Sequence, residues 1–126
     1  METVEVTAAT FESTIEKGIV IIDWWAPWCG PCRAFAPAYE AASTRHPDIV
    51  FAKIDTDAEP ELAGELEIRA IPTLMVFRNG ILLFAQPGAV TTQALDQLID
   101  HVRRVDMDEV RREIAKRLDD ETRRST

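Results

Sequence analysis

Residues 22–33 of the chain read IDWWAPWCGPCR and contain its only two cysteines, Cys29 and Cys32. The stretch overlaps a continuous run of β-branched and aromatic residues, Ile19 to Trp25, which is typical of a central strand covered on both faces. The residues after it, from Pro31 to about Arg45, favour a helix. Both cysteines are therefore expected where a strand turns into a helix.

The composition indicates one acidic domain. The chain has 126 residues, of which 46% are hydrophobic, enough for a single core but not for a second full domain. Its formal net charge is −8. Because a nucleic-acid groove needs positive charge to displace the counterions of phosphates, this balance argues against nucleic-acid binding.

The N-terminal residues METVEV lack the basic and apolar regions of a signal peptide. The longest apolar run is interrupted by Asp23 and is too short to span a membrane. We therefore expect a cytoplasmic protein without membrane contact. In a reducing compartment, an isolated Cys-x-x-Cys pair indicates redox or metal chemistry rather than a structural cross-link.

The rest of the chain alternates strands and helices. Strands are expected at residues 4–6, 49–55, 70–77 and 81–84, and helices at 7–17, 58–66 and from 91 or 92 to 102. Asn79-Gly80 is a strong hairpin signal, so the last two strands should pair antiparallel. This order predicts an α/β domain with a central mixed sheet flanked by helices on both faces.

The composition changes after Val105, since 13 of the last 21 residues are charged, seven acidic and six basic. Asp106 and Glu109 form a capping-box pair, and apolar residues recur at helical spacing as far as Leu118. We predict one domain over residues 1–105 and a charged amphipathic helix over 106–126. The helix is expected to pack back on the domain, with self-association or partner binding as the alternatives.

The spacing of Cys29 and Cys32 suits a reversible disulfide. On the first turn of a helix the two side chains face the same way with Cβ atoms about 5 to 6 Å apart, close to the separation that a disulfide needs. The positive end of the helix dipole also favours the thiolate of Cys29. We therefore predict that Cys29 attacks, and that Cys32, one turn deeper and shielded, resolves the mixed disulfide.

Two other interpretations of the cysteine pair remain open. A purely structural disulfide across two intervening residues closes a very small loop and constrains the unfolded chain little. A structural zinc site needs four ligands, and only His46 and His101 are available as further histidine or cysteine ligands, without finger-like spacing. The pattern agrees best with a redox switch.

Asp23 lies in the middle of the most apolar predicted strand, where an unpaired carboxylate is costly. Such a group holds its proton or finds a partner, and a purely structural Asp is the alternative to a functional one. A buried carboxyl with a raised pKa is suited to take the proton of Cys32. Lys53, on the neighbouring predicted strand, either tunes Asp23 through its charge or is an ordinary surface lysine.

With Asp23, the motif WCGPC at 28–32 and Ile71-Pro72-Thr73 in this order, the sequence resembles the thioredoxin family in its bacterial type, from about residue 4 to residue 104. The resemblance implies the thioredoxin fold with an added C-terminal helix. It implies that Cys29 is the nucleophile, that Cys32 is the resolving cysteine bonded to it in the oxidised form, and that Asp23 is the buried general base, accompanied by Lys53.

The resemblance also implies a surface that binds clients. In the family, a loop with a cis proline, matched here by Ile71-Pro72, pairs through its backbone with an extended client segment; from the sequence alone a trans proline is the default. Trp28 as a packed core ring and Gly88 as a plain turn are the alternatives. The matching residues are Trp28, Gly30, Pro31, Ile71, Pro72, Gly88 and Ala89.

The implied activity is the reduction of protein disulfides, with electrons that come from NADPH through a flavin thioredoxin reductase. The chain itself would then bind no cofactor or metal, and its partners would be the reductase and disulfide-containing client proteins. We expect a monomer. Two alternatives are a dedicated reductase for one client, with specificity from the tail, and a binding module in which the tail and the thioredoxin surface hold one partner.

Overall fold

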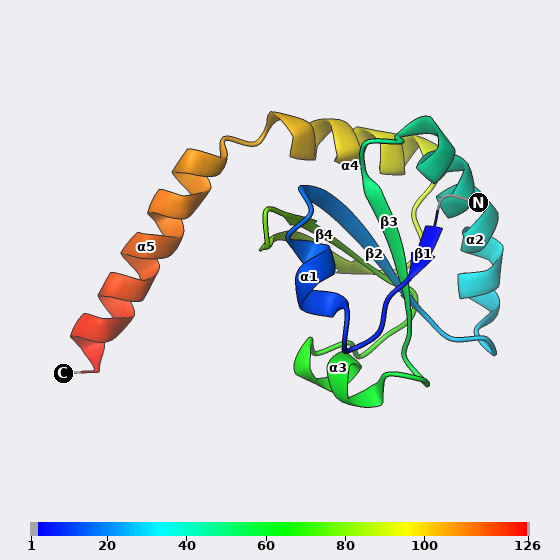
Figure 1. The fold of residues 1–126 in the computed structure, drawn as a ribbon, viewed down its shortest axis with the longest axis horizontal. Helices are drawn as coiled ribbons and strands as arrows, with labels where there is room; N and C mark the ends of the chain where they lie inside the picture. The colour runs from blue at the N-terminus through cyan, green and yellow to red at the C-terminus, as the bar shows by residue number, and fades with distance from the viewer. Residues whose placement is uncertain (1–2, 126) are drawn as a thin grey trace.

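The run Ile19–Trp25 forms the central strand, β2, with the bounds that the sequence predicts. The computed structural model describes residues 3–125. In it, β2 pairs in parallel with β3 (Val50–Asp55) and antiparallel with β4 (Thr73–Arg78). The edge strands are β1 (Thr3–Glu5), parallel to β3, and β5 (Ile81–Pro87), antiparallel to β4. The order β1-β3-β2-β4-β5 confirms the predicted mixed sheet (Figure 1).

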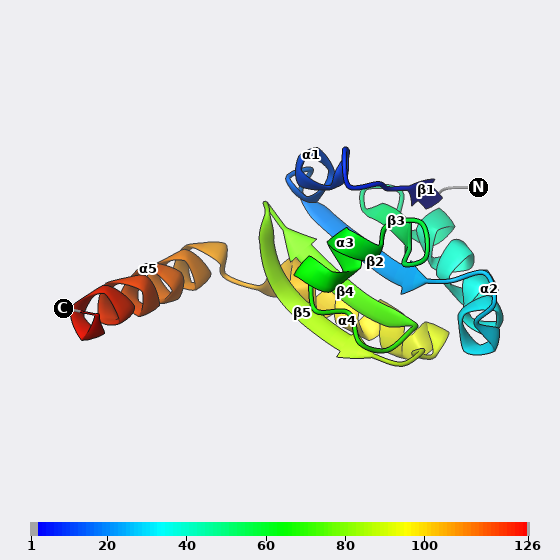
Figure 2. The ribbon, with the colours of Figure 1, turned by 90° about the horizontal axis from the view of Figure 1, so that it is seen from below.

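Helices cover both faces of the sheet, as predicted. On one face, α1 (Phe11–Ile15) and α3 (Pro60–Glu65) pack over a core that includes Trp24. On the other face, α2 (Gly30–Arg45) and α4 (Thr92–Arg104) pack over a second core. In Figure 2 the sheet separates α3, in front, from α4, behind. Side chains of β2 enter both cores, which explains why its sequence is apolar at consecutive positions.

Helix α1 is shorter than predicted and begins at Phe11 rather than after Thr7. The backbone N–H of Thr7 donates to Thr10 Oγ1, and the N–H of Thr10 donates to the carbonyl of Thr7, each at 3.1 Å. These bonds close a turn that precedes the helix. Side chains of Thr compete with helical backbone bonds in this way, which the apolar spacing does not reveal.

The remaining bounds differ from the predictions by a few residues. Strand β4 begins at Thr73 rather than at residue 70, because the preceding segment bends through a cis Ile71–Pro72 peptide, which the family resemblance implies. Asn79 and Gly80 have positive φ angles of 54° and 83°, as a tight hairpin between β4 and β5 requires. Strand β5 continues to Pro87 instead of ending at residue 84.

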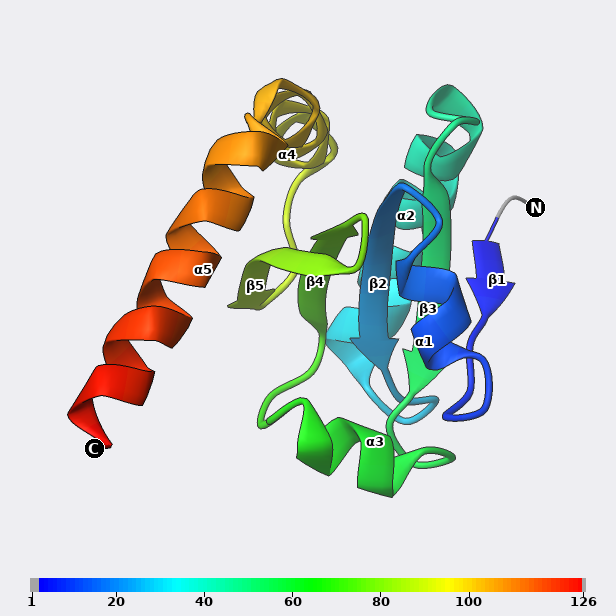
Figure 3. The same cartoon turned by 60° about the vertical axis from the view of Figure 1, so that its left-hand side comes forward.

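The C-terminal helix, α5 (Met107–Arg124), is present but only partly packed. The Asp106 carboxylate accepts from the backbone N–H of Asp108 (3.0 Å) and of Glu109 (3.2 Å), so Asp106 is the cap predicted from the sequence. Met107 is buried, whereas Ile114 is 38% and Leu118 58% exposed. The expected packing on the domain therefore holds for the beginning of the helix only, and its far end projects outward (Figures 1 and 3).

Arg78, the last residue of β4, holds the connection between α4 and α5. Its Nη1 donates to the carbonyl oxygens of Val102 at 3.0 Å and Val105 at 3.1 Å, and lies 3.5 Å from that of Arg103. Carbonyls at the end of a helix lack the usual i+4 partners. The carbonyl of Val102 accepts from the N–H of Val105 at 3.3 Å, and the guanidinium adds a charged donor to it and to the carbonyl of Val105. The point from which α5 leaves the domain is thereby fixed. Within residues 3–125 no helix is long and apolar enough to cross a bilayer.

Candidate active site

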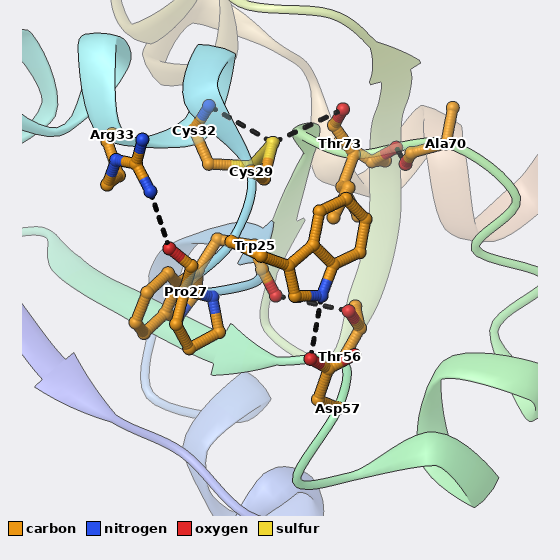
Figure 4. Close-up of a disulfide and its surroundings, with 11 residues drawn as sticks. Trp25, Pro27, Cys29, Cys32, Arg33, Thr56, Asp57, Ala70 and Thr73 are labelled. Carbon is orange, nitrogen blue, oxygen red and sulfur yellow. Dashed lines mark hydrogen bonds between the residues drawn. A yellow bond between two sulfur atoms is a disulfide. The ribbon is translucent and has the colours of Figure 1, made fainter.

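The two cysteines lie where β2 passes into α2, as the sequence predicts. Cys29 is the N-cap of α2 and forms a disulfide with Cys32, with the Cα atoms 5.2 Å apart. The backbone N–H of Cys32 donates to Cys29 Sγ at 3.2 Å (Figure 4). When the disulfide is reduced, this N–H and the helix dipole stabilise a negative charge on the same sulfur. The geometry thus favours Cys29 as the thiolate.

Both cysteines are largely buried in the disulfide form. Cys29 is 5% exposed and Cys32 2%, and both belong to a small apolar cluster with Ala26 that Trp25 and Ile71 border. Sγ of Cys29 lies 3.9 Å from the carbonyl oxygen of Ile71. The exposed fractions of the two cysteines therefore differ less than the predicted contrast between an attacking and a shielded cysteine.

Asp23 is fully buried in β2, and neither of its carboxylate oxygens has a hydrogen-bond partner among residues 3–125. Burial raises the pKa of Asp23 from its ordinary 3.8 to about 6, against a smaller lowering by the positive charge of Lys53. A carboxyl in this state exchanges its proton close to neutral pH. That property suits a general acid or base.

Lys53 stands opposite Asp23 in the pairing of β2 with β3, where the sequence places it. The structure adds Tyr39 of α2, which was not among the site residues predicted from the sequence. Its single hydroxyl hydrogen is shared between the carbonyls of Ala52, at 2.7 Å, and Ile21, at 3.0 Å. Burial and then the charge of Asp23 raise the pKa of Tyr39 well above its ordinary value, so this phenol stays protonated beside the carboxyl.

The loop around Pro72 and the segment around Gly88 meet next to the cysteines. The backbone N–H of Gly88 donates to the carbonyl of Pro72 at 2.7 Å, and the hydroxyl of Thr73 donates to the carbonyl of Ala70 at 2.6 Å. Gly88 has φ +99°, a conformation that favours glycine over a plain turn residue. Ile71 and Pro72 thus lie beside Gly88 and Ala89 on one side of the cysteine pair, with Pro72 buried, Ile71 half-buried and both Gly88 and Ala89 exposed. Gly30 and Pro31 are exposed on α2.

Trp28 is 66% exposed, so the alternative that it is a packed core ring is wrong. Its indole N–H donates to Asp57 Oδ2 at 2.7 Å. Asp57, in the turn that follows β3 (Figure 4), is a residue of the site that the sequence did not predict, and no local pattern marks it. Beside Trp28 lies a hollow of about 440 Å³ whose other lining residues are Thr56, Ile68, Arg69, Ala70 and Ile71.

Within residues 3–125, no group of three or more His, Cys, Asp or Glu side chains is placed to hold a metal ion. His46, one of the two histidines considered as ligands, lies with Nε2 3.1 Å from Asp96 and stacks on Phe51. The arrangement around the cysteines therefore offers an activated sulfur, a second sulfur within bonding reach and a buried proton acceptor. Those groups are sufficient for dithiol–disulfide exchange.

Comparison with known proteins agrees with this geometry. A family model described as Thioredoxin matches residues 2–101. The chain is 50% identical over 114 residues to "Putative thioredoxin 2" of Streptomyces coelicolor, covering 90% of this chain and 85% of that protein. It is 36% identical over 101 residues to "Thioredoxin" of Bacillus subtilis, covering 79% of this chain and 97% of that protein.

Two solved structures have the same fold. One is a thioredoxin of Plasmodium falciparum, with a TM-score of 0.71 and 37% identity, covering 79% of this chain and 97% of that one. The other is the oxidised form of mitochondrial thioredoxin 3 from Saccharomyces cerevisiae, with a TM-score of 0.72 and 32% identity, covering 79% of this chain and 94% of that one. In both comparisons about a fifth of this chain lies outside the match.

Proposed function

Because this chain belongs to the thioredoxin family and is a thiol–disulfide oxidoreductase, we propose that it reduces disulfides of many client proteins through Cys29 and Cys32. The observation that carries the proposal is the position of Cys29, at the N-terminus of α2 with the N–H of Cys32 directed at its sulfur. Residues 1–105 form the catalytic domain in this proposal, and residues 106–126 are an appended helix.

In the proposed reaction the Cys29 thiolate attacks one sulfur of the client disulfide. The client S–S bond breaks, its other sulfur leaves as a thiolate that takes up a proton, and Cys29 is joined to the client in a mixed disulfide. Cys32 then loses its proton and attacks Cys29. The second client thiol is released, and two electrons have passed from the Cys29–Cys32 dithiol to the client.

Asp23 is the proposed acceptor of the Cys32 proton. Its burial, its unpaired oxygens and its pKa of about 6 support this role. We expect Asp23→Asn to slow the release of client from the mixed disulfide and to alter the pH dependence of that step. A stopped-flow measurement of release between about pH 6 and pH 8 checks this. Equal rates for both proteins at every pH would leave Asp23 with a structural role.

Clients are proposed to bind against the surface formed by Trp28, Ile71, Pro72, Gly88 and Ala89, with Gly30 and Pro31 at its border. A shallow surface beside a backbone carbonyl accepts extended segments of many sequences. The oxidised protein is then recharged by a flavin thioredoxin reductase with NADPH, so no cofactor resides on this chain. The proposed location is the cytoplasm, where a reducing pool of NADPH maintains this direction of flow.

Turnover of insulin with NADPH and a panel of thioredoxin reductases tests the proposed function. The wild-type chain is expected to reduce insulin with at least one reductase, Cys29→Ser to be inactive, and Cys32→Ser to accumulate a mixed disulfide. Failure of the wild type to reduce insulin or any other generic disulfide, with a reductase that is active on its own thioredoxin, would contradict it.

A dedicated reductase for one client is the second candidate, favoured by the uncovered residues Ile114 and Leu118 of α5. Removal of residues 106–126 separates the two candidates. Under the general role, the truncated chain reduces insulin and captures the same clients through Cys32→Ser as the full chain does. Under the dedicated role, insulin reduction stays and capture of a single client is lost.

A further inference from the structure

Helix α5 and the hairpin of β4 and β5 border a groove that nothing in the described chain fills. The groove measures about 260 Å³. Ile81 and Leu82 of β5 and Val110 and Ile114 of α5 supply its apolar lining, and Glu109, Glu113 and Arg117 of α5 supply the rest. Leu82 is itself 44% exposed, and Leu118, one turn beyond Ile114, is exposed as well. Together the exposed Leu82, Ile114 and Leu118 and the half-buried Val110 form one strip, which we call the α5 strip.

The strip is held in place at one end of the helix. Arg78 fixes the carbonyls of Val102 and Val105, Asp106 caps the first turn, and Met107 is buried. The groove is therefore formed before a partner binds, which lowers the entropic cost of binding. Figures 1 and 2 place α5 at the opposite end of the molecule from the start of α2, so an occupant of the groove leaves the cysteine pair accessible.

The charge distribution decides what kind of occupant fits. Within Met107–Arg124 there are six acidic and six basic residues, so α5 carries no net charge and the formal charge of −8 resides entirely in the rest of the chain. Two copies that approach through their domains repel each other, because the domains carry the same sign. They do not repel through α5, which makes α5 the surface best suited to contact with a second copy.

The sequence of α5 is also complementary to itself. When two α5 helices run antiparallel with a two-fold axis level with position 116, Ile114 of each copy stands opposite Leu118 of the other. In the same register Arg111 stands opposite Glu121, and this pairing occurs twice by symmetry. Both residues border the α5 strip on the helical periodicity, at the edge where interhelical ion pairs form. Apolar and charged partners therefore agree in one alignment.

We propose that α5 is a self-association helix, and that two copies of this chain pair through antiparallel α5 helices with the α5 strip at the interface. This goes beyond thiol chemistry and departs from the monomer expected from the sequence. A helix of 18 residues is only about 27 Å long, and an interface of that size lies below that of stable dimers. The dimer is accordingly weak and depends on concentration.

The relatives differ in whether they have a counterpart of α5. The match to the Streptomyces coelicolor relative covers 114 residues, more than the 105 that precede Asp106, so it extends into α5. The match to the Bacillus subtilis relative covers 101 residues and includes nearly all of that protein. A protein of that length has no counterpart for a complete α5.

Sedimentation equilibrium of the oxidised full-length chain, from micromolar to millimolar concentration, tests the proposal. The wild type is expected to shift from monomer to dimer, and the double variant Ile114→Gln/Leu118→Gln to stay a monomer throughout. Val4→Gln, which removes an exposed apolar side chain from β1, is the matched control and is expected to dimerise like the wild type. A wild type that stays monomeric at every concentration overturns the proposal.

A charge exchange tests the antiparallel register. Arg111→Glu or Glu121→Arg alone is expected to weaken dimerisation about tenfold, since each places like charges together twice, and the double exchange to restore it. Arg111 also contacts Asp108 at 3.0 Å within its own helix, so far-UV circular dichroism and unchanged insulin reduction must show that each variant is folded. A double exchange that remains as weak as the single variants overturns the register and with it the proposed pairing.

Discussion

Lys53 stands opposite Asp23 in the parallel pairing of β2 and β3, yet its amine lies 4.5 Å from the centre of the Trp25 ring rather than on the carboxylate. A cation held over an aromatic ring is stabilised without a carboxylate partner. Its positive charge lowers the pKa of Asp23 but does not outweigh the effect of burial. Asp23 thus retains a pKa of about 6, and its charged form is unfavourable inside the fold.

Asp23→Asn should change the pH dependence of stability. The pKa of Asp23 is raised from 3.8 to about 6 in the fold, so the folded protein binds this proton more tightly than the unfolded chain. Wild-type stability then falls as pH rises between these two values and levels off above about pH 6, a loss of about 3 kcal/mol.

Urea unfolding of both oxidised proteins between about pH 4 and pH 8 measures this effect. Asparagine does not titrate, so apart from the loss of this titration the substitution changes the free energy of unfolding by an amount that does not depend on pH. The stability of the variant relative to the wild type should therefore rise only between about pH 3.8 and pH 6, where Asp23 titrates. Asp48, whose pKa is lowered to about 2 by its hydrogen bond with Arg103, is common to both proteins and cancels. A constant difference between the two proteins would show that Asp23 does not titrate in this range.

Asp57→Ala should weaken client binding without slowing the chemical step. Loss of the 2.7 Å hydrogen bond frees the exposed indole of Trp28, which then orders only when a client arrives. We expect KM for insulin to rise about threefold with kcat unchanged, which corresponds to a hydrogen bond of modest net strength. Asp57→Asn retains an acceptor oxygen and should behave almost as the wild type; if it matches Asp57→Ala, the hydrogen bond does not position Trp28.

Arg78→Met should destabilise the fold by about 1 to 3 kcal/mol, because the carbonyls of Val102 and Val105 lose a charged donor. Methionine keeps the apolar stem of the side chain. Arg104→Met is the control, since its guanidinium pairs with Asp100 on the exposed surface of α4 and such pairs contribute about 0 to 1 kcal/mol. Urea unfolding compares the two, and equal losses would mean that Arg78 is an ordinary surface residue.

Substitution by alanine should have opposite effects on stability at two glycines. Gly88 has φ +99°, so Gly88→Ala should cost about 1 to 2 kcal/mol although no atom lies within 4 Å of the added Cβ. Gly64 lies inside α3 with open space around its Cβ position, so Gly64→Ala should stabilise by about 0.5 to 1 kcal/mol. Thermal unfolding measures both, and a neutral Gly88→Ala would show that the loop adapts.

The parts of the fold that the sequence predicts best are those whose signals are local. The β-branched run gives the bounds of β2, and Asn79-Gly80 gives the hairpin. The start of α1 is missed because two threonines close a turn through their side chains and backbone, which competes with the helix that the apolar spacing suggests. Propensity alone does not resolve such a competition.

In the site, the chain order reveals Cys29, Cys32 and Asp23, because all three lie within one strand–turn–helix unit. Asp57 is not revealed, since its bond with Trp28 joins residues that are 29 positions apart. The course of α5 is also not revealed. Its apolar residues show that one face of the helix is suited to packing. Only the structure shows that the domain buries Met107 and leaves Ile114 and Leu118 exposed.

The exposure of Trp28 gives this chain a built-in optical probe. Of its three tryptophans, Trp24 is fully buried and Trp25 half-buried, whereas Trp28 stands 66% exposed in the same turn as the disulfide. Iodide in solution should therefore quench the fluorescence of Trp28 selectively. The quenchable fraction of the emission then follows occupancy of the client surface in real time, with no dye attached to the protein.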